Sequence, residues 1–320
     1  MFAPPTALDA RDFRVSLVGA GALGSALAKR LANAGYPFVS IVNRTLSDAR
    51  RLADEIGVST YSDNLSDLSP QTNLLLLAVS DHALESVAEA VSKLHLPFHR
   101  LTVAQFSGAL TTDALGALVR KGAIALSLHP FQTFPKGISE KEVEQSFKCY
   151  FGLQADELEG VEIGKKLAHD LGGKVMLVPK EAKTLYHIAG VMASNYLVTL
   201  ASLSSEVFAA LGLSPKDAAK VIEPIMRQTL SNIASAPTIA DALTGPIERG
   251  DAKIIERHLR ELSEQIPHLL PVYAALAIET ARVAIHKGSI SQNDASEILE
   301  MLETASRRES ESEQPSSPSV

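Results

Sequence analysis

The chain has 320 residues, of which 46% are hydrophobic and 21% are charged, and its formal net charge is −7. This length predicts two domains or one large one, and the composition is typical of a globular protein with a sizeable core. The acidic balance and the lack of a Lys/Arg cluster argue against a nucleic-acid partner. A single cysteine, Cys149, excludes an internal disulfide and a cysteine-based metal cage, so we expect no metal site.

The start of the sequence and its apolar runs argue against a signal peptide and a membrane span. No basic region followed by an apolar run opens the sequence, so we expect no signal peptide. The longest apolar run, at 74–79, is too short to span a bilayer. We therefore expect a cytoplasmic protein without a membrane partner. The polar, proline-containing end predicts a disordered tail over 306–320.

Short apolar strands alternate with helices in the first half of the chain. We expect helices over 19–35, 47–57, 81–94, 111–122 and near 159–166. We expect strands at 14–18, 38–42, 58–61, 74–79, 101–106, 123–128, 147–151 and 172–179. This alternation predicts an α/β fold with a mostly parallel sheet that is covered on both faces.

Helical patterns alone follow Pro179, so we place a domain boundary there. The expected helices cover 181–211, 215–232, 238–243, 251–264, 268–287 and 291–305. The predicted organisation is an N-terminal extension over 1–12, a nucleotide-binding domain over 13–179, a helical substrate and dimerisation domain over 180–305, and the tail.

A glycine-rich turn, GAGALG, follows the first strand and opens the first helix. In this position the spacing Gly19-x-Gly21-x-x-Gly24 is typical of dinucleotide binding, because glycines allow the tight turn and the close approach of a pyrophosphate. The helix N-terminus adds free N–H groups for the phosphates. The alternative is a glycine turn in a domain that binds no nucleotide. The cofactor-binding residues expected here are Gly19, Ala20, Gly21, Ala22, Leu23 and Gly24.

The end of the second strand favours NADP over NAD. Asn43, Arg44 and Thr45 stand where NAD-binding chains usually place an acidic residue for the ribose hydroxyl. An arginine pairs with a 2′-phosphate, whereas a carboxylate repels it. The alternative is that Arg44 is a solvated surface charge and that Ser47 caps the next helix.

Polar or small residues also follow three further strands, where open α/β sheets bind their ligands. Val79 and Ser80 end the fourth strand, and Ser107 ends the fifth. We expect these three residues to contact the cofactor. His129 ends the sixth strand, and it either contacts the substrate or caps a loop.

The segment KTLYHIAGVMASNYL at 183–197 places polar side chains on an apolar helix. Lys183, His187 and Gly190 share one face at 3.6 residues per turn, and Asn195 lies beside it. A buried lysine is costly unless it is paired or used, so we expect Lys183 to act as proton donor and His187 and Asn195 to assist. The alternative is a lysine that snorkels to solvent and a histidine that is satisfied in the core.

The segment LTGPIERGD predicts a rigid turn between two helices. Thr244 is a candidate for substrate contact if this turn closes over the active site. Asp251 is interpreted as the N-cap of the next helix.

Together these motifs resemble a known family. The glycine turn, NRT, SGALTTDAL, LSLHPFQTFP, KTLYHIAGVMASNYL and LTGPIERGD are similar to Rossmann-like proteins with a domain of unknown function, DUF2520, which are predicted oxidoreductases. The resemblance covers nearly the whole chain. It implies a Rossmann-type doubly wound parallel sheet, then an all-helical domain like the C-terminal domain of 6-phosphogluconate dehydrogenase, with NADP as cofactor.

The architecture is more distantly similar to ketopantoate reductases, pyrroline-5-carboxylate reductases and β-hydroxyacid dehydrogenases, whose helical domains often dimerise. Lys183 matches the lysine that acts at the substrate oxygen in two of these families. The β-hydroxyacid pattern Lys-x-x-x-Asn has His187 in its last position here, so that substrate does not carry over.

Two hypotheses remain open from the sequence. The first is an NADP-dependent reductase, forming a homodimer and acting on a small carbonyl or imine substrate. The second is a sensor or regulatory protein that binds NADP without transferring a hydride. Turnover of NADPH with a panel of oxo acids and cyclic imines separates them.

Overall fold

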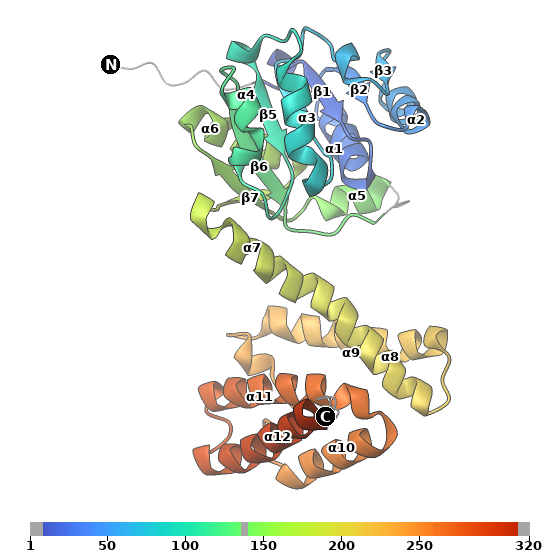
Figure 1. Ribbon diagram of the computed structural model, residues 1–320, viewed down its shortest axis with the longest axis vertical. Helices are drawn as coiled ribbons and strands as arrows, with labels where there is room; N and C mark the ends of the chain where they lie inside the picture. The colour runs from blue at the N-terminus through green and yellow to red at the C-terminus, as the bar shows by residue number, and fades with distance from the viewer. Residues whose placement is uncertain (1–8, 136–139, 313–320) are drawn as a thin grey trace, which may run out of the picture. The chain divides into compact units, whose positions relative to one another are not determined.

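A computed structural model describes residues 9–135 and 140–312 of the chain. The chain forms two compact units, Met1–Asn195 and Tyr196–Val320, which we treat separately (Figure 1). Most of the predicted N-terminal extension, residues 1–8, lies outside the described residues, as does 313–320 of the predicted tail.

The first unit is built on an 8-stranded sheet with the order β3-β2-β1-β4-β5-β6-β7-β8. All neighbours are parallel except β6 and β7, which run antiparallel. The crossover from β3 to β4 places the switch point of the sheet between β1 and β4. The strands are β1 (Val15–Val18), β2 (Phe38–Val42), β3 (Tyr61–Ser62), β4 (Leu74–Leu77), β5 (Thr102–Gln105), β6 (Ile124–Pro130), β7 (Tyr150–Ala155) and β8 (Lys174–Leu177).

Helices cover both faces of this sheet, which explains why its central strands are apolar. Strands β1 and β4 are buried along their whole length, as parallel strands in doubly wound folds are. Leucine and alanine residues of α1, α2 and α6 pack on one face, and those of α3 and α4 pack on the other. These helices are α1 (Ala22–Asn33), α2 (Leu46–Ile56), α3 (Asp81–Ser92), α4 (Gly116–Val119) and α6 (Leu158–Leu171). The predicted fold class is thereby confirmed.

After β8 the chain enters the helix α7 (Lys183–Gly190), which continues as one turn of π-helix over Val191–Asn195. The second unit then contains α8 (Tyr196–Ala210), α9 (Pro215–Ser235), α10 (Ala252–Gln265), α11 (Leu270–Lys287) and α12 (Gln292–Ser312). Ser214 caps α9, because its hydroxyl accepts from the Asp217 N–H, and Pro215 occupies the first helical position. Small residues on α11 (Ala274, Ala277, Ala281 and Ala284) allow close packing against the neighbouring helices.

Three local expectations differ from the structure. The seventh strand lies at 150–155 instead of 147–151, because Phe147 belongs to the end of the preceding segment and packs in the core. A short helix, α5 (Glu140–Ser146), precedes it and was not expected. Helix α12 runs to Ser312, so 306–312 of the predicted disordered tail is helical.

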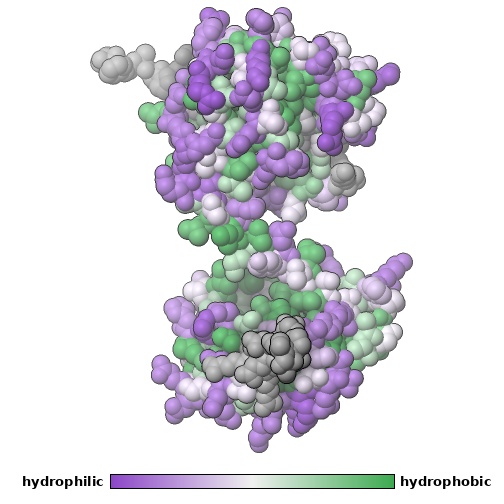
Figure 2. Space-filling view, viewed as in Figure 1, coloured by the Kyte–Doolittle hydropathy of each residue, from purple (hydrophilic) through white to green (hydrophobic). Residues whose placement is uncertain are grey.

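Two helical stretches, Lys180–Ala210 and Pro267–Lys287, are long and apolar enough to cross a membrane by length and composition. One-third of the 18-residue apolar window of the second stretch is buried within the chain. The 18-residue apolar window of the first stretch has no buried residue, although Lys183 and Tyr186 of this stretch are buried, and Figure 2 shows green, hydrophobic surface along its α7 part.

Candidate functional site

The glycine turn between β1 and α1 has the geometry that its three glycines require. Gly19 has φ +102, and a Cβ there would lie 2.3 Å from the Ala78 carbonyl oxygen. A Cβ on Gly24 would lie 1.9 Å from the Gly19 oxygen, so this glycine allows the helix to pack against the turn. A Cβ on Gly21 would meet no atom within 4 Å, which leaves open space in front of the turn.

The remaining residues of the motif lie at the start of α1. Gly21 is its N-cap, and Ala22 and Leu23 form its first turn. The first N–H groups of a helix have no intrahelical partner and favour anions. Ala20 is buried and donates its N–H to Asn43 Oδ1 at 2.9 Å, which ties the turn to the end of β2.

Asn43 and Arg44 serve different purposes at the end of β2. Asn43 is occupied structurally, because its amide also donates to the Thr45 carbonyl at 3.0 Å. Arg44 is exposed, and within residues 9–135 and 140–312 no hydrogen bond or ion pair engages its guanidinium. Thr45 is the N-cap of α2 without a side-chain bond, so its hydroxyl is also accessible. A free cation and hydroxyl therefore lie where a 2′-phosphate would be recognised.

At the next strand ends, fewer side chains than expected are free to contact a cofactor. Val79 is partly buried against the core, and the exposed Ser80 hydroxyl lies 3.3 Å from His82 Nε2. Ser107 accepts from the N–H groups of Ala109 and Leu110 at 3.1 and 2.9 Å, so its side chain shapes the loop after β5.

Lys183 is buried, with 1% of its surface exposed, at the start of α7. Its Nζ donates to Ser127 Oγ on β6 at 2.7 Å and lies 5.5 Å from the centroid of the Tyr186 ring. Ser127 pairs in register with Gln105, the last residue of β5. Burial lowers the pKa of Lys183 to about 8, against the opposing effect of Asp81. The ammonium is thus held in the dry interior beside a neutral hydroxyl.

His129 lies two residues beyond Ser127, on the same side of β6. Its Nδ1 is 2.8 Å from the Tyr186 hydroxyl, and the two rings meet edge to face. Burial lowers the pKa of His129 to about 4, with further contributions from Lys183 and His187. His129 is therefore neutral at physiological pH.

His187 and His129 converge on the loop after β5. A Cβ on Gly108 would lie 2.8 Å from His187 Cδ2 and 3.0 Å from His129 Nε2. A Cβ on Gly190, one turn after His187, would lie 3.2 Å from the ring of Phe131. The face of α7 that carries Lys183, His187 and Gly190 thus faces the ends of β5 and β6.

Two further predicted residues follow α7 along the chain. Asn195 is exposed at the end of the π-helical turn. Thr244 is exposed in the second unit, on a turn that Lys287 holds by donating to the Leu243 carbonyl at 3.0 Å. Asp251 caps α10, as expected, by accepting from the Ile254 N–H at 3.2 Å.

The sequence reasoning missed Ser127 and Tyr186. Ser127 had a detectable signal, because it is a polar residue within the apolar strand ALSL and shares a face with His129. Tyr186 follows Lys183 by three residues, a spacing that places both on one side of a helix. Its apolar ring suggested a core residue and concealed the role of its hydroxyl.

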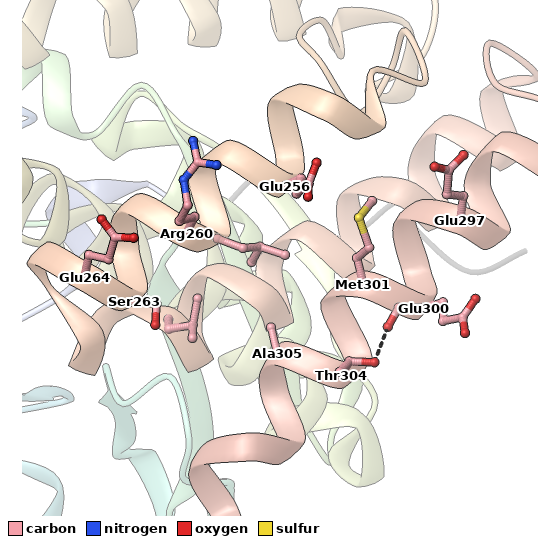
Figure 3. Close-up of a pocket in the computed structure, with 11 residues that line it drawn as sticks. Glu256, Arg260, Ser263, Glu264, Glu297, Glu300, Met301, Thr304 and Ala305 are labelled. Carbon is pink, nitrogen blue, oxygen red and sulfur yellow. Dashed lines mark hydrogen bonds between the residues drawn. The ribbon is translucent and has the colours of Figure 1, made fainter.

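A hollow of about 720 Å³ lies in the second unit between α10 and α12 (Figure 3). Its polar lining is exposed and mostly anionic, with Arg260 as its cation. Four carboxylates there would repel a phosphate-bearing cofactor: Glu256, Glu264, Glu297 and Glu300. The chemistry of the first unit therefore makes the better functional site.

Comparisons with known proteins agree with the resemblance predicted from the motifs. Residues 1–130 match the Rossmann-like domain, and residues 149–280 match the domain of unknown function DUF2520. The chain therefore carries a Rossmann-like domain followed by DUF2520, as expected. Among curated proteins, no relative matches the sequence.

Solved structures share this architecture. A candidate NADP oxidoreductase from Bacteroides fragilis is 24% identical, with a TM-score of 0.68 over 84% of this chain and 98% of its own. A Thermotoga maritima protein is 26% identical, with a TM-score of 0.63 over 92% and 99%. The 1-pyrroline-5-carboxylate reductase of Streptococcus pyogenes is 16% identical, with a TM-score of 0.57 over 85% and 98%.

Proposed function

We propose that the chain is an NADP-dependent oxidoreductase that transfers a hydride between NADPH and a small carbonyl or imine substrate. The observation that carries this proposal is the buried ammonium of Lys183 at the strand ends of a sheet whose first strand opens into a dinucleotide-type glycine turn. Active sites are where buried groups with shifted pKa values gather.

The chain's residues fit the phosphorylated cofactor. The open space at Gly21 and the free N–H groups of α1 suit a pyrophosphate, and unpaired Arg44 suits a 2′-phosphate. The structural neighbours support the same choice, because the Bacteroides fragilis protein is described as an NADP oxidoreductase and the Streptococcus pyogenes protein as a reductase.

The polar cluster supplies the proton chemistry that such a reduction needs. NADPH, when bound, supplies the hydride. Lys183 stabilises the negative charge that develops on the substrate oxygen or nitrogen and donates the proton, for which a pKa of about 8 is well matched. His129 stays neutral beside it and acts as a hydrogen-bonding group.

We also propose that the protein is a cytoplasmic homodimer that associates through the helical unit. Helix α8 is apolar, yet none of its residues is buried within the chain. A second copy is the partner that would cover this surface without adding another component.

Calorimetry with NADPH and NADH tests the cofactor choice. In Arg44→Ala, we expect NADPH affinity to fall about 10- to 100-fold, the effect of losing a charge-assisted bond, while NADH affinity is unchanged. The control is Arg50→Ala, since Arg50 is exposed on α2 and faces Asp54 at 3.8 Å. Equal losses for both cofactors, or no NADPH binding by the unmodified protein, would contradict the proposal.

Turnover with a panel of oxo acids and cyclic imines tests the chemistry. Lys183→Ala is expected to lose at least about 100-fold in kcat while NADPH affinity is retained. Tight NADPH binding without turnover of any panel member would instead identify a sensor.

A further inference from the structure

We propose that Tyr186 is a positioning residue: its hydroxyl donates to Nδ1 of His129 and holds the imidazole in the Nε2–H tautomer, so that Nε2 presents a hydrogen-bond donor to the substrate. This inference rests on the proposed function only in its last step. The tautomer itself is a property of the protein without substrate.

The distances favour donation from Tyr186 to the ring. The hydroxyl lies 2.8 Å from Nδ1 and 3.3 Å from the carbonyl oxygen of His129. The longer contact exceeds the usual O–H···O range of about 2.5–3.0 Å, whereas the shorter one is a normal hydrogen bond. We assign the one proton of the phenol to the shorter bond, because it would gain little from the 3.3 Å contact with the carbonyl oxygen. Nδ1 is then the acceptor, and the ring proton resides on Nε2.

The fold provides a seat for this hydroxyl. Gly152 of β7 pairs directly with His129 of β6, and a Cβ at Gly152 would lie 2.6 Å from the Tyr186 oxygen. Because Gly152 has no side chain, the tip of Tyr186 fills the space beside it. Phe131, two residues after His129 on the same strand face, holds the Tyr186 ring at 5.2 Å between centroids. Sheet register, glycine and aromatic packing together fix the contact.

The opposite ring nitrogen is left available. Nε2 of His129 lies beside Gly108, and in the part of the chain that the structure describes no residue hydrogen-bonds to it. His129 is only partly buried, so a substrate atom can reach this side. Burial raises the pKa of Tyr186 to about 12 and lowers that of His129, so both groups keep these protonation states at neutral pH.

Lys183 and His129 have different roles in this arrangement. Lys183 carries the positive charge and the transferable proton, while His129 contributes a neutral donor whose direction is fixed. Environments that separate the pKa values of neighbouring groups commonly mark such assignments. A histidine with an unfixed tautomer would present a donor only part of the time.

Nitrogen-15 NMR of the histidine rings tests the proposal, with His129→Gln identifying the resonances of His129. We expect the proton on Nε2 in the unmodified protein at neutral pH. In Tyr186→Phe, which keeps the ring contacts, we expect exchange between both tautomers. Tyr150→Phe is the control, because Tyr150 is exposed on β7. A proton on Nδ1 in the unmodified protein, or an unchanged tautomer in Tyr186→Phe, would overturn the inference.

Two further measurements connect the tautomer to catalysis and guard against misfolding. Gly152→Ala fills the seat of the hydroxyl and should reproduce the tautomer exchange if Tyr186→Phe fails to fold. In a substrate assay, we expect Tyr186→Phe to lower kcat at least about 10-fold with NADPH affinity unchanged. Full turnover with a mixed tautomer would refute the positioning role, whereas absence of turnover in the unmodified protein would refute the proposed function and leave the NMR result standing.

Discussion

Lys183 holds its ammonium group out of water, and the hydrogen bond that it makes is to the neutral hydroxyl of Ser127. Such a group destabilises the fold as long as it is charged, because burial disfavours the ion. A site for proton transfer tolerates this cost, since a lysine with a lowered pKa both holds and releases a proton near neutrality. Stability and function therefore oppose each other at this residue.

Replacing Lys183 by methionine should consequently stabilise the protein while abolishing its chemistry. The pKa of Lys183 falls from 10.5 to about 8 on folding, so the unfolded chain binds more protons between these values. The destabilisation is complete below pH 8 and disappears as the pH rises through 10.5. At pH 7 we expect Lys183→Met to raise the free energy of unfolding by about 2 kcal/mol, after allowing for the lost bond to Ser127.

Urea denaturation at several pH values checks this expectation. Lys121→Met is the control, because Lys121 is exposed and its replacement should change the unfolding free energy by less than about 0.5 kcal/mol. A destabilised Lys183→Met at pH 7 would show that the ammonium is well paired in the fold, and a gain that persists at high pH would show that the buried charge is not its cause.

How much of the site the sequence could predict depends on the range of each interaction. Helical periodicity placed Lys183 and His187 on one face, and that face does meet the strand ends. The bond to Ser127 joins residues 56 positions apart, and the seat at Gly152 depends on the register of β6 with β7. Register is a property of the folded sheet, so these partners could not be read from local patterns.

At the scale of elements, the glycine turn combines two requirements that substitutions can separate. Gly24 has no room for a side chain, because its Cβ would collide with the Gly19 carbonyl oxygen. Gly21 has φ −72, which other residues adopt readily, and open space beside it. Gly24 is therefore needed for packing, and Gly21 for binding of the ligand.

Alanine at each position should therefore give opposite results. Gly24→Ala is expected to lower the free energy of unfolding by about 2–4 kcal/mol, since backbone must move. Gly21→Ala is expected to change stability by less than about 1 kcal/mol but to weaken NADPH binding at least about 10-fold, because the methyl group enters the phosphate site. Thermal denaturation measures the change in stability of each variant, and calorimetry measures its NADPH affinity. Unchanged NADPH affinity in Gly21→Ala would place the cofactor elsewhere.

The helix after β8 contains a π-helical turn that the sequence pattern did not predict. The pattern at 181–211 predicted one long helix, and the segment is helical throughout, but Val191–Asn195 forms a π-helical turn. A π-turn advances the side chains by a smaller angle per residue than 3.6 residues per turn implies, so the faces predicted from that period no longer hold after Val191. Such turns depend on packing and often occur near functional sites, and hydropathy alone does not reveal them.

At the scale of the whole molecule, the sequence placed a domain boundary at Pro179, where strand patterns stop. The compact units divide at Asn195 instead. The physical reason is that Lys183 and Tyr186 pack against β6 and β7, which joins α7 to the sheet. A change in composition thus marks the change of architecture, while the contacts of a few side chains decide which unit a helix belongs to.

Helices α8 and α9 of the helical unit expose large apolar side chains. Helix α8 buries none of its residues, and α9 leaves Ile225 and Leu230 largely exposed. Between these helices lies a hollow of about 580 Å³ whose lining is predominantly apolar, including Val198, Ile222 and Met226. Burying such a surface against a second copy contributes about 25 cal/mol per Å² of apolar area, which is sufficient for a stable dimer of ordinary interface size.

Sedimentation analysis should therefore find a dimer, and a charge placed in this surface should dissociate it. We expect Ile225→Glu and Leu230→Glu to yield monomers, because an unpaired carboxylate cannot be buried in an apolar interface. Lys253→Glu on the exposed side of α10 is the control and should remain dimeric. A monomer for the unmodified protein would contradict the proposed assembly. Co-flotation with lipid vesicles would then assign the apolar surface of Lys180–Ala210 to a membrane instead, since that stretch also meets the length and hydropathy of a spanning helix.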